Sequence, residues 1–160
     1  MSDTGSDTAS DTTSPSSAGT INVAAVVIRN SAGEVLCVRK YSSPRFQLPG
    51  GKPEPGESMA GTAVRETAEE VGVALHRDSL GFLGRFSAEA SNEPGHTVTS
   101  AVFTAPALPT GPAHQTPSPA AEIAEIAWIP PANPREYELA PLLATRIFPA
   151  LAPRQLGAVT

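Results

Sequence analysis

The chain consists of short apolar runs separated by clusters of glycine, proline and polar residues. Five of these runs are continuously apolar or alternate between apolar and polar positions, which predicts β-strands. The predicted strands are Ile21–Arg29, Glu34–Arg39, Leu80–Ser87, Thr97–Phe103 and Ile123–Ile129. The turn signal Asn30-Ser31-Ala32-Gly33 joins the first two runs and predicts that they form a β-hairpin.

One longer segment has the period of an amphipathic helix. Ser58 is a suitable N-cap and Gly72 a suitable stop, so a helix is predicted over Met59–Val71. Its apolar side, expected to pack on a sheet, consists of Met59, Ala60, Ala63, Val64, Thr67 and Val71. Glu66, Glu69 and Glu70 lie at i, i+3 and i+4, so their side chains share one face.

A second helical period covers Glu138–Ile147. Pro141 fits only the first turn of a helix, which leaves the start of this helix open. Pro106–Pro119 is rich in Pro, Gly and Thr and predicts an exposed loop. Strands that alternate with helices in a chain of 160 residues predict a single α/β domain.

Both ends of the chain differ from this central domain. Residues 1–20 are mostly Ser, Thr, Asp and Gly, so they are predicted to be a disordered tail before a domain at 21–150, with a second tail at 151–160. The first segment lacks the basic and apolar parts of a signal peptide, and no apolar run is long enough to span a membrane.

Charge and cysteine content exclude further classes of protein. The formal charge is −5, of which Asp3, Asp7 and Asp11 contribute −3, leaving about −2 for the domain. No basic face is visible, which argues against a duplex nucleic-acid binder. Cys37 is the single cysteine, so no intramolecular disulfide forms, and its apolar neighbours predict a buried strand thiol. These features suggest a cytoplasmic location.

The acidic face of the first helix is the main candidate for chemistry. Carboxylates at these offsets destabilise an isolated helix by about 0.2–0.5 kcal/mol per pair, and a hard divalent cation such as Mg²⁺ reverses the sign. A solvated acidic face is the alternative interpretation. Arg65 is placed to pair with Glu69, which leaves the other acids without a local cation. The metal site is the favoured interpretation.

The loop before this helix supports a metal site. Glycine and proline between Pro49 and Glu57 force the chain away from helix and strand, and the loop delivers Glu57 beside the acidic helix. Glycines permit a close approach of the backbone to a ligand, so the Gly50 carbonyl is a candidate metal ligand.

Together, the segment Gly51–Val73 has the spacing G-x5-E-x7-R-E-x-x-E-E-x-G, set by Gly51, Glu57, Arg65, Glu66, Glu69, Glu70 and Gly72. This pattern resembles the Nudix box of the Nudix hydrolase superfamily, with Thr67 in place of the usual aliphatic residue. The strand-like runs Gln47–Gly51 and Glu122–Ile129 extend the resemblance to about Ile21–Pro130. The resemblance implies an α/β fold, an α/β/α sandwich with a mixed central sheet and one helix on each face.

The resemblance also implies a Mg²⁺-dependent pyrophosphohydrolase, with Mn²⁺ as a substitute. It assigns Glu66 and Glu70 as the main metal ligands with help from Glu69, and Gly51 and Glu57 as support for the site. Arg65 orients a glutamate through a salt bridge. The general base varies among Nudix enzymes and is not assigned.

Other residues are candidates for substrate binding. Arg39 and Arg45 are suited to phosphate, and solvated surface arginines are the equal alternative. By the resemblance, Glu122 is a candidate for a late glutamate at the metal site, with Glu93 as its rival, and an exposed glutamate at a strand edge is the commoner alternative. Phe46, like Trp128, is assigned to the core.

The favoured substrate is a nucleoside triphosphate or a modified nucleotide. ADP-ribose or a dinucleoside polyphosphate is the alternative, and a nucleotide-binding regulator without turnover is the competing class. Homodimerisation, common in the family, stays open, with Leu80–Phe86 or the last helix as candidate surfaces.

Overall fold

A computed structural model of the protein describes residues 19–90, 93–108, 116–134 and 136–151. The strands are β1 Thr20–Val27, β2 Val35–Lys40, β3 Phe46–Gln47, β4 Gly50–Gly51, β5 Gly81–Glu89, β6 Thr97–Thr104 and β7 Ile123–Ile129. The helical segments are α2 Met59–Val71, the 3₁₀ turn η2 Arg77–Ser79, the π-helical η3 Leu143–Ile147 and α3 Phe148–Leu151. Except for residues 19, 20 and 151, the two predicted tails lie outside the described residues, and β1 begins at Thr20.

The strands form two sheets. The first has the order β4-β1-β6-β5 and is mixed, since β1 runs parallel to β6 and antiparallel to β4. The parallel register pairs Thr20 with Thr97 and continues to Val27 with Thr104. The second sheet has the order β3-β2-β7 and is antiparallel. The fold class predicted from the sequence is confirmed.

The predicted hairpin of the first two strands forms only next to its turn, where the Asn30 amide donates to the Glu34 carbonyl at 3.1 Å and the Leu36 amide to the Ile28 carbonyl at 2.9 Å. β1 and β2 belong to different sheets and are joined by a single bridge between Arg29 and Val35. The physical reason is that β4 and β6 already occupy both hydrogen-bonding edges of β1. The turn after Asn30 therefore carries the chain into the second sheet, where β2 pairs with β3 and β7.

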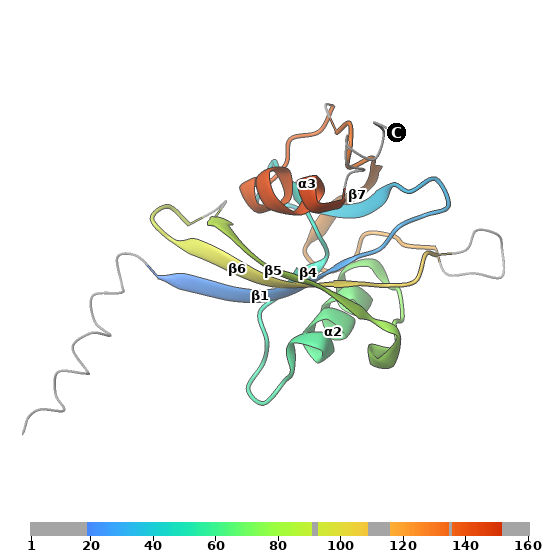
Figure 1. Ribbon diagram of the computed structural model, residues 1–160, viewed down its shortest axis with the longest axis horizontal. Coiled ribbons are helices and arrows are strands. Elements are labelled where there is room, and N and C mark those ends of the chain that lie inside the picture. Colours follow the sequence, from blue (N-terminus) through green and yellow to red (C-terminus); the bar gives the residue numbers. More distant parts are fainter. Residues whose placement is uncertain (1–18, 91–92, 109–115, 135, 152–160) are drawn as a thin grey trace, which may run out of the picture.

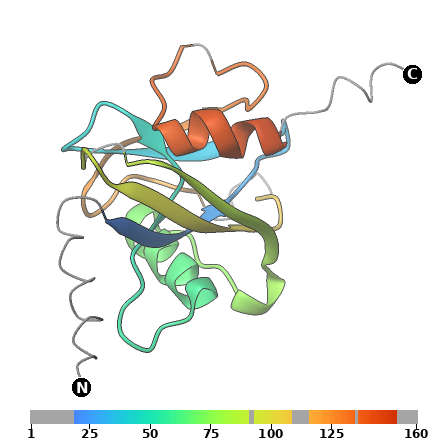
Figure 2. The ribbon, with the colours of Figure 1, turned by 60° about the vertical axis from the view of Figure 1, so that its left-hand side comes forward.

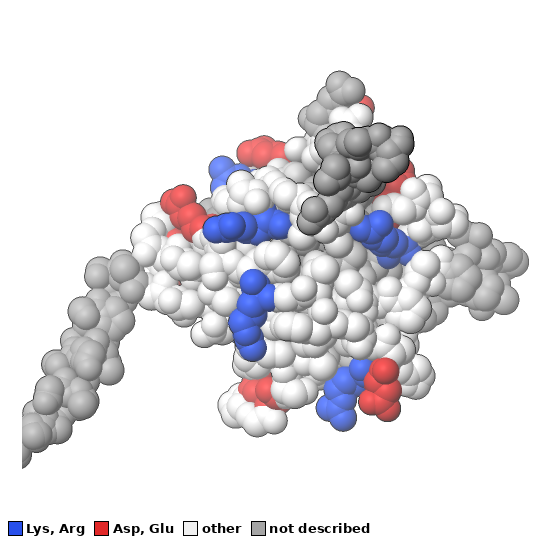
Figure 3. All heavy atoms as spheres, in the orientation of Figure 1, with Lys and Arg blue, Asp and Glu red and all other residues white. Residues whose placement is uncertain are grey.

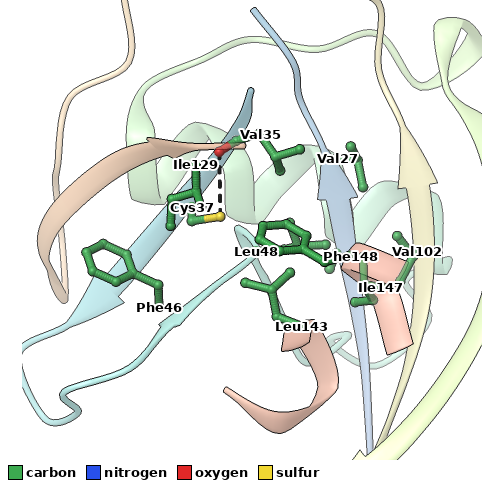
Figure 4. Packing of buried hydrophobic residues seen from close by; sticks show 11 residues of the cluster. Val27, Val35, Cys37, Phe46, Leu48, Val102, Ile129, Leu143, Ile147 and Phe148 are labelled. Atoms are coloured by element: carbon green, nitrogen blue, oxygen red, sulfur yellow. Dashed lines mark hydrogen bonds between the residues drawn. The ribbon is translucent and has the colours of Figure 1, made fainter. Parts of the chain in front are cut away.

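A helical layer lies on each side of the strands (Figures 1 and 2). Successive residues of β1 alternate between the two layers. Val26 and Ile28 belong to one apolar cluster with Ala63 and Val71 of α2. Val27 belongs to the other cluster, which contains Leu143, Ile147 and Phe148 of the last helical segment (Figure 4). The sandwich thus places α2 and the last helical segment on opposite faces.

α2 has the bounds predicted from the sequence. The Ser58 hydroxyl accepts a hydrogen bond from the Gly61 amide at 3.0 Å and caps the first turn. Gly72 ends the helix in the left-handed region at φ 72°, where a glycine is favoured. Thr67 is buried, and its hydroxyl donates to the Ala63 carbonyl at 2.7 Å. Thr67 therefore faces the core, as predicted.

The last helical segment covers residues 141–151, so it begins later than the helical period of the sequence. Pro141 is its first residue, the position at which proline is tolerated. A π-helical turn occupies Leu143–Ile147, and the Phe148 amide donates to the Leu143 carbonyl. Pro149 has no amide hydrogen, so it cannot make the α-helical hydrogen bond to the Thr145 carbonyl. This missing bond is consistent with the wider π-helical turn that precedes Pro149.

Three further observations concern membrane-spanning helices, the surface charge and the single cysteine. In the described ranges, no helix is long and apolar enough to cross a membrane. On the face shown in Figure 3, basic and acidic side chains are scattered among uncharged ones, without a continuous basic patch. Cys37 is fully buried, and burial raises the pKa of its thiol.

Candidate active site

Arg65 ties the glycine-rich loop to α2. Its guanidinium forms two hydrogen bonds with Glu57, Nε to Oε2 at 2.8 Å and Nη2 to Oε1 at 2.9 Å. Nη2 also donates to the Lys52 carbonyl at 3.1 Å. Such a bidentate pair is geometrically specific, which fixes the loop relative to the helix. The salt bridge predicted between Arg65 and Glu69 is present at 3.3 Å, but Glu57 is the main partner.

Glu57 lies in the loop before α2 and is held by several hydrogen bonds. Besides Arg65, it accepts hydrogen bonds from the Thr62 hydroxyl at 2.8 Å and the Glu54 amide at 2.9 Å. These contacts lower the pKa of Glu57 to about 2, and the hydrogen bonds from Arg65 are the largest cause. Glu57 is therefore ionised at neutral pH, and its oxygens are occupied by protein donors.

Glu66 lies directly against Gly51. A Cβ atom at position 51 would lie 2.6 Å from the carboxylate carbon of Glu66, so the absence of a side chain there makes room for Glu66. Arg65 Nη1 donates to Glu66 Oε2 at 3.1 Å. Burial raises the pKa of Glu66, against the opposing effect of Arg65. This carboxylate is held in place and kept only partly solvated.

Glu70 is the least solvated acid of the cluster. Its side chain is buried, and Oε1 accepts a hydrogen bond from the Gly50 amide at 3.2 Å. Oε2 is buried as well and has no hydrogen-bond partner. Burial raises the pKa of Glu70 to about 8, and the nearby charges of Glu66 and Glu122 act in the same direction. A buried carboxylate oxygen without a partner is costly unless a cation binds to it.

Glycine is required at position 50 for a different reason. A Cβ atom on Gly50 would lie 2.1 Å from the Ala24 carbonyl oxygen, which is a backbone atom of the adjacent strand β1. β4 can therefore approach β1 only with glycine at this position. That approach places the Gly50 amide beside Glu70.

A cavity of about 440 Å³ opens beside these acids. This volume lies in the range of about 300–1,000 Å³ that is common for small-molecule sites. Glu66, Gly50 and Gly51 line one part of it, together with the cations Lys40 and Lys52. Apolar residues of β1, β6 and residues 140–147 line another part, and the lining also contains Glu89 and Glu93. The cavity thus connects a charged region with an apolar region.

The structure brings only some of the predicted residues to this cavity. Glu122 lines it and pairs with Lys40 at 3.4 Å, and Glu93 lines it as well. Glu69 is more than half exposed and has its salt bridge with Arg65.

The two arginines proposed for phosphate lie outside the residues that line the cavity. Arg39 pairs with Glu125 at 2.9 Å, and Arg45 pairs with Glu138 at 3.6 Å. Phe46 is buried in the core against Tyr137, as expected from the sequence.

Several residues of the cavity were not found from the sequence. Lys40, Lys52, Glu89 and Ser100 all line it. The alternation of the run Thr97–Phe103 contained a signal for Ser100, because it places a hydroxyl among the inward-facing positions of a strand. The remaining three come from separate elements, and one sequence contains no signal that they meet.

The oxygen atoms at this site fit a hard divalent cation. In the part of the chain that the structure describes, no three acidic, histidine or cysteine side chains gather closely enough to hold a metal among themselves. Glu66, which Arg65 contacts through Oε2, and Glu70, whose Oε2 has no partner, are the acids of α2 that lie against the glycines of β4. Mg²⁺ is typically held by one or two carboxylates, with water and substrate phosphate as further ligands.

A family model and a curated protein both match the sequence of this chain. A family model described as NUDIX domain matches residues 19–150. A putative 8-oxo-dGTP diphosphatase from Bacillus subtilis (strain 168) is 43% identical over 47 residues, which are 29% of this chain and 32% of that protein. The match therefore spans about a third of the length of that curated relative.

Two solved structures show the same fold. The MutT protein from Methanosarcina mazei Go1 aligns with a TM-score of 0.65 at 23% identity, covering 83% of this chain and 93% of that one. A bifunctional NMN adenylyltransferase/ADP ribose pyrophosphatase from Francisella tularensis, described in complex with AMP and a manganese ion, aligns with a TM-score of 0.59 at 16% identity. That alignment covers 83% of this chain and 42% of the other.

Proposed function

This chain belongs to the Nudix family, and on that premise we propose that it is a Mg²⁺-dependent pyrophosphohydrolase that acts on a nucleoside diphosphate derivative. The favoured substrate is a nucleoside triphosphate or a modified nucleotide. The observation that carries the proposal is the buried, unpartnered Oε2 of Glu70, whose other oxygen accepts a hydrogen bond from Gly50, a residue that lines a cavity of suitable size.

One group of residues is proposed to hold the metal, and another is proposed to hold the substrate. Glu66 and Glu70 are the carboxylate ligands, the Gly50 carbonyl is a further candidate ligand, and Glu69 assists from the exposed end of the same helix face. When bound, Mg²⁺ neutralises phosphate oxygens and lowers the pKa of water. Mn²⁺ has similar ligand preferences and is expected to substitute.

The chain itself positions the acids for the reaction. Arg65 and Glu57 hold the loop so that Gly51 stays against Glu66. Lys40 and Lys52 line the cavity and supply positive charge for the outer phosphate oxygens. Neither Arg39 nor Arg45 is needed for this arrangement.

The reaction consumes one water molecule. The water oxygen forms a bond to one phosphorus, the bond from that phosphorus to the bridging oxygen breaks, and the bridging oxygen leaves with the other phosphoryl group. A carboxylate at the cavity accepts the proton of the water. The carboxylates in the lining are Glu54, Glu66, Glu89, Glu93 and Glu122, and Glu66 is proposed as a metal ligand, so the other four are the candidates for this role.

The proposal is tested with a substrate panel and metal omission. Nucleoside triphosphates, 8-oxo-dGTP, ADP-ribose and a dinucleoside polyphosphate are incubated with Mg²⁺, Mn²⁺ or EDTA, and products are identified by mass. Hydrolysis that requires the metal and is lost in Glu66→Gln and Glu70→Gln supports the proposal. Glu125→Gln is the matched control, because Glu125 pairs with Arg39 outside the cavity lining.

The competing outcomes are distinct. Turnover of ADP-ribose or a dinucleoside polyphosphate alone would keep the enzyme and replace the favoured substrate. Tight binding of a nucleotide without turnover of any compound in the panel would replace the enzyme by a regulator on the same fold.

A further inference from the structure

Ser100 has a hydroxyl without a partner in the interior of the protein. It lies in β6, exposes none of its surface, and its Oγ has no hydrogen-bond partner. Its neighbours across the sheet are Val23 of β1 and Phe86 of β5, whose side chains offer no hydrogen-bonding atom. Buried polar groups are nearly always satisfied, so this hydroxyl requires an explanation.

The position of Ser100 relates it to the cavity. Ser100 belongs to the lining of the cavity although it exposes no surface, so it lies at a closed part of the wall. Val23 and Val98 lie beside it on the same face of the sheet, and Leu142 and Ile147 of the last helical segment complete the apolar lining. Val102, the next inward-facing residue of β6, packs against this helical segment (Figure 4).

We propose that Ser100 determines specificity by hydrogen bonding the heterocyclic base of the nucleotide within the apolar part of the cavity. This inference rests on the proposed function, since it assigns the apolar end of the cavity to the base and the glutamate end to the phosphates. Aliphatic side chains of the sheet and the helical segment suit the faces of a planar ring. A hydroxyl both donates and accepts, so it serves any base with a polar atom at that edge.

The lack of any other partner for Ser100 among the described residues explains why this hydroxyl is expected to have a large effect on nucleotide specificity. In the described part of the chain, Ser100 and Glu70 contain the two buried side-chain oxygens without a partner. Glu70 lies at the proposed metal end, which leaves Ser100 as the corresponding group at the apolar end. A site that hydrogen bonds a substrate atom discriminates strongly against an analogue lacking it, because the buried group is then left unpaired.

The test compares Ser100→Ala with the wild-type protein by titration with nucleoside monophosphates in the presence of Mg²⁺. The probes are AMP, GMP, CMP, UMP and 8-oxo-GMP, with ribose 5-phosphate as the compound without a base. For the tightest nucleotide, Ser100→Ala is expected to raise Kd about tenfold, the loss of roughly one hydrogen bond, and to leave ribose 5-phosphate unchanged. In turnover, KM rises and kcat changes little.

Stability separates this role from a structural one. Ser100→Ala removes an unsatisfied hydroxyl, so the Tm of the free protein is expected to stay equal or rise. The matched control is Ser87→Ala on β5, because the Ser87 hydroxyl hydrogen bonds Thr99 at 2.7 Å and Ser87 lies outside the cavity lining. Ser87→Ala is expected to lower the Tm and leave nucleotide affinity unchanged.

Three results would overturn the role of Ser100. These are wild-type affinity of Ser100→Ala for every nucleotide, an equal loss of affinity for ribose 5-phosphate, or a Tm that falls as it does in Ser87→Ala. Absence of hydrolysis with the wild-type protein is a separate result that refutes the proposed activity, because the base titration does not require turnover.

Discussion

Replacement of Glu70 by glutamine should stabilise the protein in the absence of metal. The pKa of Glu70 is raised from its ordinary value of 4.5 to about 8 because the carboxyl is buried. A carboxyl with a raised pKa holds its proton longer in the folded state than in the unfolded state. Stability is therefore fully present below pH 4.5 and is lost as the pH rises toward 8.

The size of this effect follows from the difference in pKa. Each pKa unit corresponds to about 1.4 kcal/mol, so ionising Glu70 in the folded protein costs about 5 kcal/mol above pH 8 and about 3 kcal/mol at pH 7. Glu70→Gln keeps the shape of the side chain and does not titrate. Without metal, the variant should exceed the wild type by up to about 5 kcal/mol at pH 8.5 and match it near pH 4.5.

Urea unfolding followed by fluorescence measures this difference. Trp128 is the single tryptophan and packs against the core beneath α2, so it reports global unfolding. The wild type, Glu70→Gln and Glu69→Gln are compared in EDTA at pH 5, 7 and 8.5. Glu69→Gln is the control, because Glu69 lies on the same helix and is largely exposed. Glu57 contributes almost no slope in this window, because its lowered pKa in the folded protein and its ordinary value of 4.5 both lie below pH 5.

Added Mg²⁺ should reduce the difference in stability between the two proteins. A ligand that binds only the folded state adds stability, and ionised Glu70 binds the cation more tightly. The wild type should therefore gain stability with Mg²⁺ at pH 8.5, and Glu70→Gln should gain much less. The reasoning would be refuted by a wild type whose stability in EDTA is flat between pH 5 and 8.5 and equal to that of Glu70→Gln.

Three further results are expected. Gly50→Ala should destabilise the fold by about 3 kcal/mol in urea unfolding, because its Cβ meets the Ala24 carbonyl oxygen; a stability equal to the wild type would contradict the close approach of β4 and β1. Gly51→Ala should keep Tm within a few degrees but lower kcat/KM about 100-fold, because its Cβ displaces only the flexible end of Glu66; unchanged kinetics would show that this carboxylate is not needed in place. Cys37 should resist a thiol reagent at pH 8 until the protein is unfolded, since burial raises its pKa, and rapid labelling of the native protein would disagree.

Local signals in the sequence were sufficient for α2. Ser58 and Gly72 fix the two ends of the helix through contacts with residues no more than four positions away. Such local contacts can be predicted from the residue types alone. The strand Ile123–Ile129 was likewise predicted with its observed bounds, because its apolar run is interrupted by proline on one side. Elements defined by local chemistry were therefore predictable.

Pairing between distant segments was not predictable in the same way. The predicted hairpin is limited to the residues next to its turn because the edges of β1 are occupied by strands that come later in the chain. At the site, the offset of Arg65 and Glu69 was visible, but the stronger pair with Glu57 depends on how the loop folds back. The different environments of Glu66 and Glu70 also depend on β4, which one sequence does not place.

Residues 140–147, which form one wall of the cavity, are synthesised after most of the other residues that line it. The acids of α2 emerge from the ribosome long before Leu143 and Ile147, which close the apolar side of the same cavity. A chain stopped before residue 140 would keep the glutamates of α2 and lose the apolar wall that contains Leu143 and Ile147. The apolar wall of the cavity is therefore synthesised after the acidic residues of its charged region.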